Sequence, residues 1–158
     1  MGDKTLPYLR MPPKIKVLEA AGAIADNRIS FIDEEVAEVI SSDGSRKYSV
    51  YVNLARNEAC STDNGTVYRG YIGYPIIAVL MIKGALPYDS KIGEALKGIP
   101  WKALNEKYKK YAIVENEIKK IASERGVTPE ELEKFKNNVY KELRRFKLKL
   151  TDICMSKE

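Results

Sequence analysis

Few residues in this 158-residue chain could carry chemistry, because it contains no histidine and only two cysteines, Cys60 and Cys154. Without imidazole, the chain lacks the common general base near neutral pH and the usual activator of a serine or cysteine nucleophile. Two sulfur ligands cannot complete a four-thiolate or a mixed Cys/His zinc site. We expect Cys60 to be a small buried residue and Cys154 to lie in a fraying tail.

Carboxylates offer one further local cluster, the acidic run Asp33, Glu34 and Glu35. No partner acid follows at ligand-like spacing, which favours a solvated surface over a metal site. The chain also shows no P-loop, dinucleotide fingerprint, pair of catalytic acids or nucleophile motif. We therefore predict no metal, no cofactor, no small-molecule substrate and no catalysis. An enzyme that uses lysine, tyrosine or carboxylate chemistry is kept as an alternative.

Positive charge and aromatic rings occur together in two segments of a chain with formal charge +5 and a pI near 9.1. Tyr68-Arg69-Gly70-Tyr71 combines groups that can stack on bases or hold a partner. The end of the last predicted helix adds a run of cations, which could contact phosphates. The predicted nucleic-acid-binding residues are Arg69, Tyr71, Lys136, Lys141, Arg144, Arg145, Lys147 and Lys149. The alternative is a solvated helix end whose cations complement the macrodipole.

The element that must organise these residues is the apolar run that follows Pro75. Seven apolar residues lead to Lys83 and Gly84, and Pro75 suits the first turn of a helix. The run is far shorter than the ~20 residues that span a bilayer, so we predict a helix buried on all sides. Around it we predict a helix over 14–25, a strand over 28–32, a hairpin of 36–41 with 47–53, a second hairpin of 58–62 with 66–71, and a helix over 90–96.

The C-terminal part changes towards lysine, glutamate and helix-forming residues after Pro87. We predict one long helix from Pro100 to Gly126 and a second that opens with a Thr128–Glu131 capping box and reaches Leu150. The two helices should form an antiparallel hairpin. Residues 118–135 also resemble a helix-turn-helix, but the acidic first turn of the second helix would face phosphates, which favours a plain hairpin.

These elements predict an α+β fold with an N-terminal helix, a small antiparallel sheet of hairpins, a buried central helix and a C-terminal antiparallel helical hairpin. The expected organisation is a flexible lead-in (1–13), a core domain (14–88), the helical hairpin (89–151) and a tail (152–158). No export signal or long apolar span is evident, so we expect a cytoplasmic protein that does not enter a membrane. The absence of glutamine and the abundance of Lys, Arg and Glu are typical of a thermophilic, archaeal-like source.

The middle of the chain carries three motifs in order: YSVYV at 48–52, ACSTD at 59–63 and GYPIIAVL at 73–80. Over about residues 36–84 this order resembles the SWIM zinc-finger family, whose pattern is a β hairpin, a Cys-x-Cys pair, and a Cys-x-His pair that opens a short apolar helix. The two pairs fall on 60–62 and 73–75, where only Cys60 is retained. We therefore predict that zinc is absent and that Tyr68, Tyr71 and Tyr74 pack against the hairpin in its place.

The resemblance implies a domain that binds nucleic acid or protein. We predict a non-catalytic intracellular interaction module that uses a basic helical surface and the Tyr/Arg/Gly segment. One alternative is a structural or assembly protein, in which the helical hairpin forms a homo-oligomer interface anchored by Tyr108, Tyr111 and Phe146. The other is the enzyme without histidine-based chemistry described above.

Overall fold

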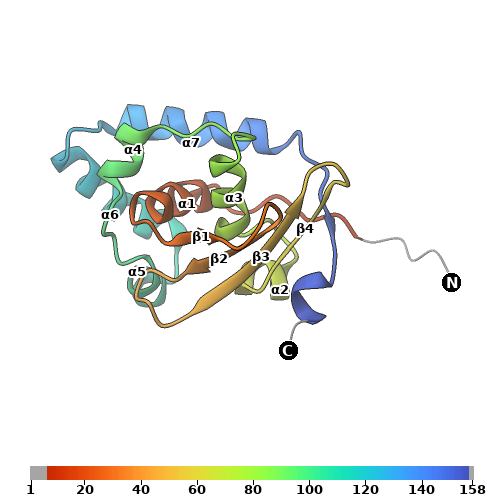
Figure 1. Ribbon diagram of the computed structural model, residues 1–158. Helices are drawn as coiled ribbons and strands as arrows, with labels where there is room; N and C mark the ends of the chain where they lie inside the picture. Colours follow the sequence, from red (N-terminus) through yellow and green to blue (C-terminus); the bar gives the residue numbers. More distant parts are fainter. Residues whose placement is uncertain (1–6, 157–158) are drawn as a thin grey trace, which may run out of the picture.

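The computed structural model describes residues 7–156 (Figure 1). The combination of helices and a sheet confirms the α+β prediction. In chain order the elements are α1 (Ile15–Ala25), β1 (Ile29–Phe31), β2 (Val36–Ile40), β3 (Lys47–Asn53), β4 (Glu58–Ser61), α2 (Asn64–Arg69), α3 (Tyr74–Ile82), α4 (Ser90–Ala95), α5 (Trp101–Tyr108), α6 (Tyr111–Glu124), α7 (Pro129–Leu143), β5 (Lys149–Leu150) and the 3₁₀ helix η1 (Ile153–Ser156).

The strands form one sheet in the order β1-β2-β3-β4-β5. Strands β1 to β4 are antiparallel, as predicted, whereas β5 runs parallel to β4. The register places Ala37 opposite Val50 and Val52 opposite Ala59, and all four side chains are buried on the inner face. The predicted β2–β3 hairpin is confirmed, with Gly44 at φ +77° in its turn.

Helix α3 lies against the inner face of this sheet. Helix α1 packs against the side of α3 that faces away from the sheet (Figure 1). Every side chain from Tyr74 to Met81 is buried, so the predicted central helix is confirmed. Helices α4 and α7 contact α1 in turn. Side chains of α6 and α7 join the same hydrophobic core as α3, which makes the core continuous across the expected boundary at residue 88.

The predicted second hairpin is wrong beyond β4, because residues 64–69 form the short helix α2. The Asp63 side chain accepts a hydrogen bond from the Thr66 backbone N–H and caps this helix. Gly70 ends it at φ +68°, the left-handed conformation that glycine adopts readily. A local cap therefore outweighed the turn that Asn64-Gly65 indicates in the sequence.

The predicted packing of three tyrosines into one cluster is also wrong. Tyr68 lies on the outer side of α2 and is 77% exposed. Tyr74 is buried and packs edge-on against Tyr48, with ring centroids 6.3 Å apart. Tyr71 is half-buried and lies elsewhere, in a polar cleft described below. Because α2 turns Tyr68 outward, the three rings cannot meet.

Hydrogen bonds centred on Thr66 close this junction instead. The buried Thr66 hydroxyl lies 3.0 Å from Asp63 Oδ1 and 3.1 Å from the Tyr71 carbonyl oxygen, and it accepts the Gly73 N–H at 3.2 Å. A Cβ at Gly73 would lie 2.2 Å from Asp63 Oδ2, so glycine is needed for this close approach. The chain thus enters α3 through a compact set of backbone and side-chain contacts.

The C-terminal helices differ from the prediction in two places. The long helix is interrupted at Lys109, which adopts φ +63° between α5 and α6. Trp101 and Val114, which lie on either side of this break, are both buried in the core. Helix α7 begins at the predicted capping box, which is confirmed, but it ends at Leu143. The chain then becomes extended and forms β5, so most of the basic run does not lie on a helix.

The two ends of the described chain are tied to the sheet. Residues 8–10, expected in a flexible lead-in, pair with neighbours: the Leu9 N–H donates to the Leu148 carbonyl at 2.8 Å, and the Arg10 N–H donates to Gly70 at 2.8 Å. Residues 1–6 of that lead-in lie outside the described residues. In the expected tail, Cys154 forms a disulfide with Cys60, so the prediction that Cys154 lies in a fraying tail is wrong, whereas the predicted burial of Cys60 is confirmed. Residues 157–158 of the tail also lie outside the described residues.

The disulfide covers the outer face of the sheet. Cys60 is the register partner of Tyr51, and both side chains are buried beneath Cys154 of η1. The outer face of the sheet is therefore partly covered at this point. Because 94 residues separate the two cysteines, the cross-link restricts a large part of the unfolded chain.

Replacing both cysteines with serine should lower the free energy of unfolding by about 2–5 kcal/mol, because the unfolded chain regains its loop entropy. Denaturant unfolding of the wild type and of the Cys60→Ser, Cys154→Ser variant would measure the loss. The wild type in strong reductant is the matched control and should unfold like the variant. Titration of two free thiols in the unfolded, unreduced protein would contradict the cross-link.

Thr66→Val should destabilise the fold by about 2–3 kcal/mol, because it leaves Asp63 Oδ1 and the Gly73 N–H buried without their shared partner. Thermal unfolding would report the change. Val67→Thr, at an exposed position of the same helix, is the control and should shift stability by less than about 0.5 kcal/mol. Equal effects of the two substitutions would refute the importance of the junction.

Candidate functional site

The structure separates the predicted nucleic-acid-binding residues into three environments. Lys136 is only 5% exposed, because Glu115 and Glu133 hold its ammonium group in ion pairs within the α6–α7 interface. Those carboxylates outweigh the opposing effect of burial and raise the pKa of Lys136. Tyr71 is half-buried in the polar cleft. Neither residue belongs to an open nucleic-acid surface, and the prediction is wrong for Lys136.

Four of the remaining predicted residues, Arg69, Arg144, Lys147 and Lys149, lie near the paired chain ends. Tyr8 and Lys149 form an antiparallel bridge, and residues directly opposite in such a pair share one face. Leu9 and Leu148 point inward and are buried, so Tyr8, Arg10 and Lys147 point away from the core. We call the outward-facing side chains the basic face: Tyr8, Arg10, Arg69, Arg144, Lys147 and Lys149.

Arg69 joins this face through the N-terminal strand. The Arg10 guanidinium donates to the Arg69 carbonyl oxygen, while the Arg10 backbone pairs with residues 70 and 72. Tyr8, Arg144 and Lys147 line a shallow hollow of about 510 Å³ beside it. The pairing of residues 8–10 therefore brings together cations that lie far apart in the sequence.

The cations of the basic face are largely free of acidic partners. Among residues 7–156, none of Arg10, Arg69, Arg144, Lys147 and Lys149 makes an ion pair. Two other predicted nucleic-acid-binding residues do not belong to the basic face. Lys141 is exposed on α7 outside the hollow, and Arg145 pairs with Glu142 at 3.5 Å.

Sequence reasoning missed two members of this face, Tyr8 and Arg10. Their signal was present, because Tyr8-Leu9-Arg10 alternates polar and apolar side chains as a half-buried strand does. The triplet was too short to be recognised without its partners. Tyr8 is 57% exposed, which leaves its ring accessible to a ligand.

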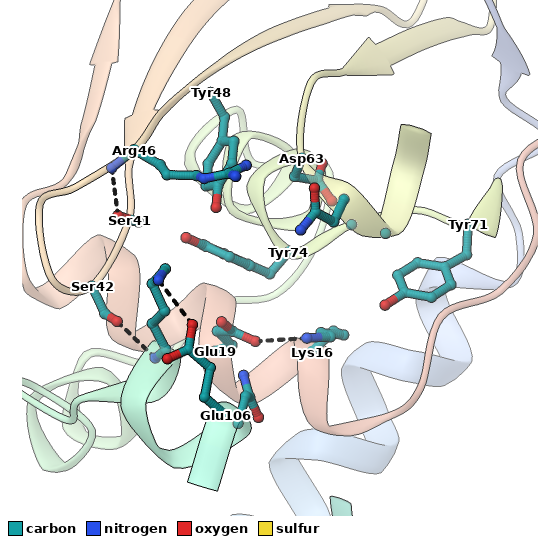
Figure 2. Close-up of a pocket in the computed structure, with 15 residues that line it drawn as sticks. Lys16, Glu19, Ser41, Ser42, Arg46, Tyr48, Asp63, Tyr71, Tyr74 and Glu106 are labelled. Atoms are coloured by element: carbon teal, nitrogen blue, oxygen red, sulfur yellow. Dashed lines mark hydrogen bonds and ion pairs between the residues drawn. The ribbon is translucent and has the colours of Figure 1, made fainter. Parts of the chain in front are cut away.

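A second concave site lies on the other side of residues 70–73, and we call it the polar cleft (Figure 2). It encloses about 290 Å³ between α1, the start of β3, the α2–α3 junction and α5. Its lining residues are mostly polar or charged: Lys16, Glu19, Ser41, Ser42, Arg46, Tyr48, Asp63, Asn64, Gly65, Tyr71, Gly73, Tyr74, Lys102, Asn105 and Glu106.

A buried ion pair forms the floor of the polar cleft. Lys16 and Glu19 occupy successive turns of α1, and Lys16 Nζ lies 3.1 Å from Glu19 Oε1. Glu19 is only 6% exposed. Burial opposes the charge on Lys16, but Glu19 together with Tyr71 and Tyr111 raises the pKa of Lys16 above its ordinary value. Lys16 therefore stays protonated at neutral pH.

The tyrosines of the cleft are held in their neutral form. Burial raises the pKa of Tyr71 to about 12 and also raises the pKa values of Tyr48 and Tyr74, with nearby carboxylates adding to the effect. At neutral pH these hydroxyls act as hydrogen-bond donors and acceptors rather than as bases. The three phenols therefore keep their protons at neutral pH.

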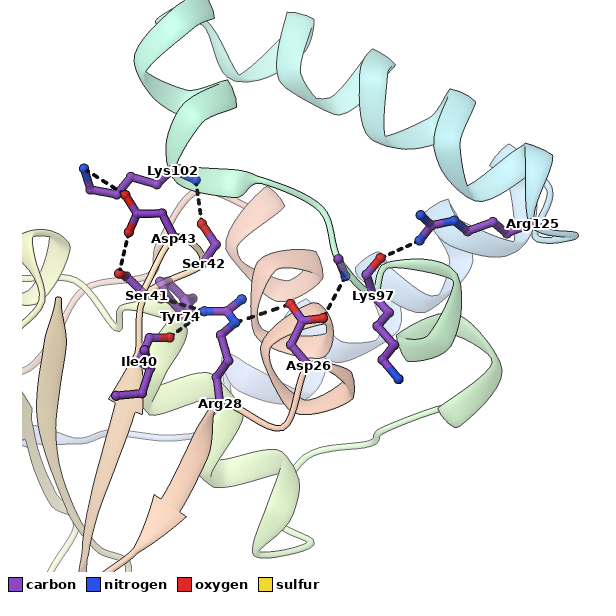
Figure 3. A network of polar contacts seen from close by, with 11 residues as sticks. Asp26, Arg28, Ile40, Ser41, Ser42, Asp43, Tyr74, Lys97, Lys102 and Arg125 are labelled. Carbon is purple, nitrogen blue, oxygen red and sulfur yellow. Dashed lines mark hydrogen bonds and ion pairs between the residues drawn. The ribbon is translucent and has the colours of Figure 1, made fainter. Parts of the chain in front are cut away.

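A polar network fixes the inner wall of the cleft (Figure 3). Arg28 donates to the Ile40 carbonyl at 2.7 Å and to the Tyr74 hydroxyl at 3.4 Å, and it pairs with Asp26 at 3.3 Å. Asp26 also accepts the Gly98 N–H at 2.7 Å. These contacts join the end of α1, the end of β2 and the α4–α5 loop around the Tyr74 ring.

The opening of the cleft is held by the turn that joins β2 to β3. The Ser42 hydroxyl accepts the Lys102 N–H at 2.9 Å, and Lys102 Nζ lies 2.9 Å from Glu106 and 3.7 Å from Asp43.

Among the residues that the structure describes, no group of three or more His, Cys, Asp or Glu side chains could hold a metal ion. None of the described helices is long and apolar enough to cross a membrane.

Tyr71 gives the cleft a titration that can be measured. A pKa raised to about 12 in the folded state, against an ordinary value near 10, means that folding favours the protonated phenol. Its contribution to stability should be complete below about pH 10 and decline as the pH rises towards 12. Tyrosinate absorbance and unfolding free energy, compared between the wild type and Tyr71→Phe, would test this. An ordinary titration of Tyr71 near pH 10 would contradict its burial.

The comparisons with known proteins place this chain in a family. The model of the family described as Uncharacterised conserved protein UCP014422 matches residues 9–149. No curated protein and no solved structure gave a significant match. The matched segment contains the polar cleft and every residue of the basic face except Tyr8. Because the match extends over most of the chain, the protein belongs to this family.

Proposed function

We propose that this protein binds single-stranded nucleic acid through the basic face. The observation that carries the proposal is a set of cations that make no ion pair within residues 7–156 and that residues 8–10 bring together from three parts of the chain. Cations without acidic partners can neutralise phosphates and release counterions. The exposed Tyr8 ring beside Arg144 and Lys147 adds a platform on which a base could stack.

Other features favour this function over the alternatives. Two of the residues expected to anchor an oligomer, Tyr108 and Phe146, pack against the core of the same chain. The hollow beside Tyr8 is lined by the cations Arg144 and Lys147 together with apolar side chains, a combination that suits bases stacked along a phosphate backbone. The protein is then a non-catalytic interaction module, and its selectivity would come from stacking more than from base-edge contacts.

We also propose a cytoplasmic setting in a thermophilic organism. Disulfides are rare in the cytoplasm of mesophiles but common inside hyperthermophilic archaea and bacteria. The Cys60–Cys154 bridge is therefore compatible with the composition of the chain, which lacks glutamine and is rich in Lys, Arg and Glu.

Arg10→Ala, Arg144→Ala and Lys147→Ala combined should weaken binding to a single-stranded oligonucleotide on the order of a hundredfold at low salt. The slope of log affinity against log salt should fall by about 2, because three phosphate contacts are lost. Fluorescence anisotropy with labelled oligonucleotides at several salt concentrations would measure both quantities.

The matched control removes the same charge elsewhere, at the exposed residues Lys97, Lys107 and Lys120. This control variant should retain most of its affinity, and Lys136→Met should have little effect on binding if it folds. Equal weakening by the two triple variants would show that net charge alone drives binding. Absence of binding by the wild type at low salt would reject the proposal.

A further inference from the structure

We propose that the polar cleft binds a small zwitterion that carries an amine and a carboxylate, with the amine on Glu19 and the carboxylate on Arg46. This site is separate from the basic face, and it does not depend on nucleic-acid binding. It contains one anionic and one cationic group whose hydrogen-bonding capacity the protein leaves partly unused.

Glu19 is the anionic half of the site. Its carboxylate is almost completely removed from solvent, yet among residues 7–156 it accepts one hydrogen bond, from Lys16 to Oε1 at 3.1 Å. A carboxylate can accept about four hydrogen bonds, and the second oxygen of Glu19 is not among the fully buried polar atoms of the described residues, so it stays accessible from the cleft. The second oxygen points into the cleft in Figure 2. A ligand ammonium group there would supply the missing donors.

Arg46 is the cationic half. Its backbone N–H donates to Ser41, but its guanidinium makes no hydrogen bond or ion pair with any described residue. The side chain lines the cleft and extends across the Tyr48 ring in Figure 2. Its charge lies close enough to Tyr48 to oppose the rise in the pKa of that phenol. The planar guanidinium suits a bidentate contact with a carboxylate.

The other charges of the cleft are already occupied. Lys16 pairs with Glu19, Lys102 pairs with Glu106 and Asp43, and both oxygens of Asp63 accept hydrogen bonds from Thr66. The lining is close to neutral overall, so a polyanion such as a sugar phosphate would find too little positive charge. A ligand with one charge of each sign matches the two available groups.

The size and walls of the cleft suit the same class of ligand. A volume of about 290 Å³ accommodates a molecule of amino-acid size together with a few waters. The rings of Tyr48 and Tyr74 supply an apolar side wall, and their neutral hydroxyls lie near the Glu19 carboxylate. The network around Arg28 holds Tyr74 in place, so the site is formed before a ligand arrives.

Calorimetric titration of the full chain with a panel of zwitterions tests the proposal, with glycine, L-leucine, L-lysine, L-glutamate and γ-aminobutyrate as probes. At least one should bind, and the amine or acid that lacks its second charged group should bind at least tenfold more weakly. Ribose 5-phosphate and adenosine monophosphate are the contrasting probes. Tighter binding of either phosphate than of any zwitterion would overturn the assignment, as would no binding across the panel.

Variants separate the two halves of the site. Arg46→Gln, at an exposed position, should weaken the best zwitterion at least tenfold but leave the amine analogue unchanged. Glu19→Gln should weaken both, and Arg46→Gln keeps the test decisive if Glu19→Gln fails to fold. Arg56→Gln, which removes an exposed arginine that pairs with Glu58, is the control and should bind normally. Unchanged affinity in Arg46→Gln would exclude the proposed site.

Discussion

The rest of this structure depends on hiding one helix that has no polar side. Ile76, Ile77 and Val79 of α3 are at most 1% exposed, although they point in different directions around its axis. Each such side chain contributes about 1.5–3 kcal/mol when it is removed from water, whereas an isolated helix of this length would not persist. The sheet must therefore cover one side of α3 and α1 the other, and the remaining helices cover α1 in turn.

Closing the N-terminal end of α3 requires polar contacts, because backbone groups cannot be buried without partners. Asp63 and Thr66 accept hydrogen bonds from backbone N–H groups of the chain that enters the helix. On the neighbouring side, Arg28 donates a hydrogen bond to the Tyr74 hydroxyl. The polar cleft lies at this end of the helix, where the apolar core gives way to hydrogen-bonding groups. Its position follows from the need to end a wholly apolar helix within a folded chain.

Local signals in the sequence were sufficient for features that depend on local physics. The apolar run after Pro75 predicted α3, and the Thr128–Glu131 capping box predicted the start of α7. Pairings between distant segments could not be predicted, because no local pattern indicates that Cys154 meets Cys60 or that Leu9 pairs with Leu148. The two concave sites depend on such pairings.

The buried position of Lys136 could have been predicted from the sequence. It lies four residues after Leu132 and three before Val139, on the buried stripe of α7, so its spacing already indicated an inward position. The basic residues after Leu143 were predicted to continue the helix. The chain instead leaves the helix there and then forms the short strand β5. The types of these residues indicated a binding surface, but its shape came from Tyr8 and neighbouring residues more than 130 positions earlier in the chain. Charge in the sequence therefore indicated most cations of the basic face, and only the fold showed which of them share one surface.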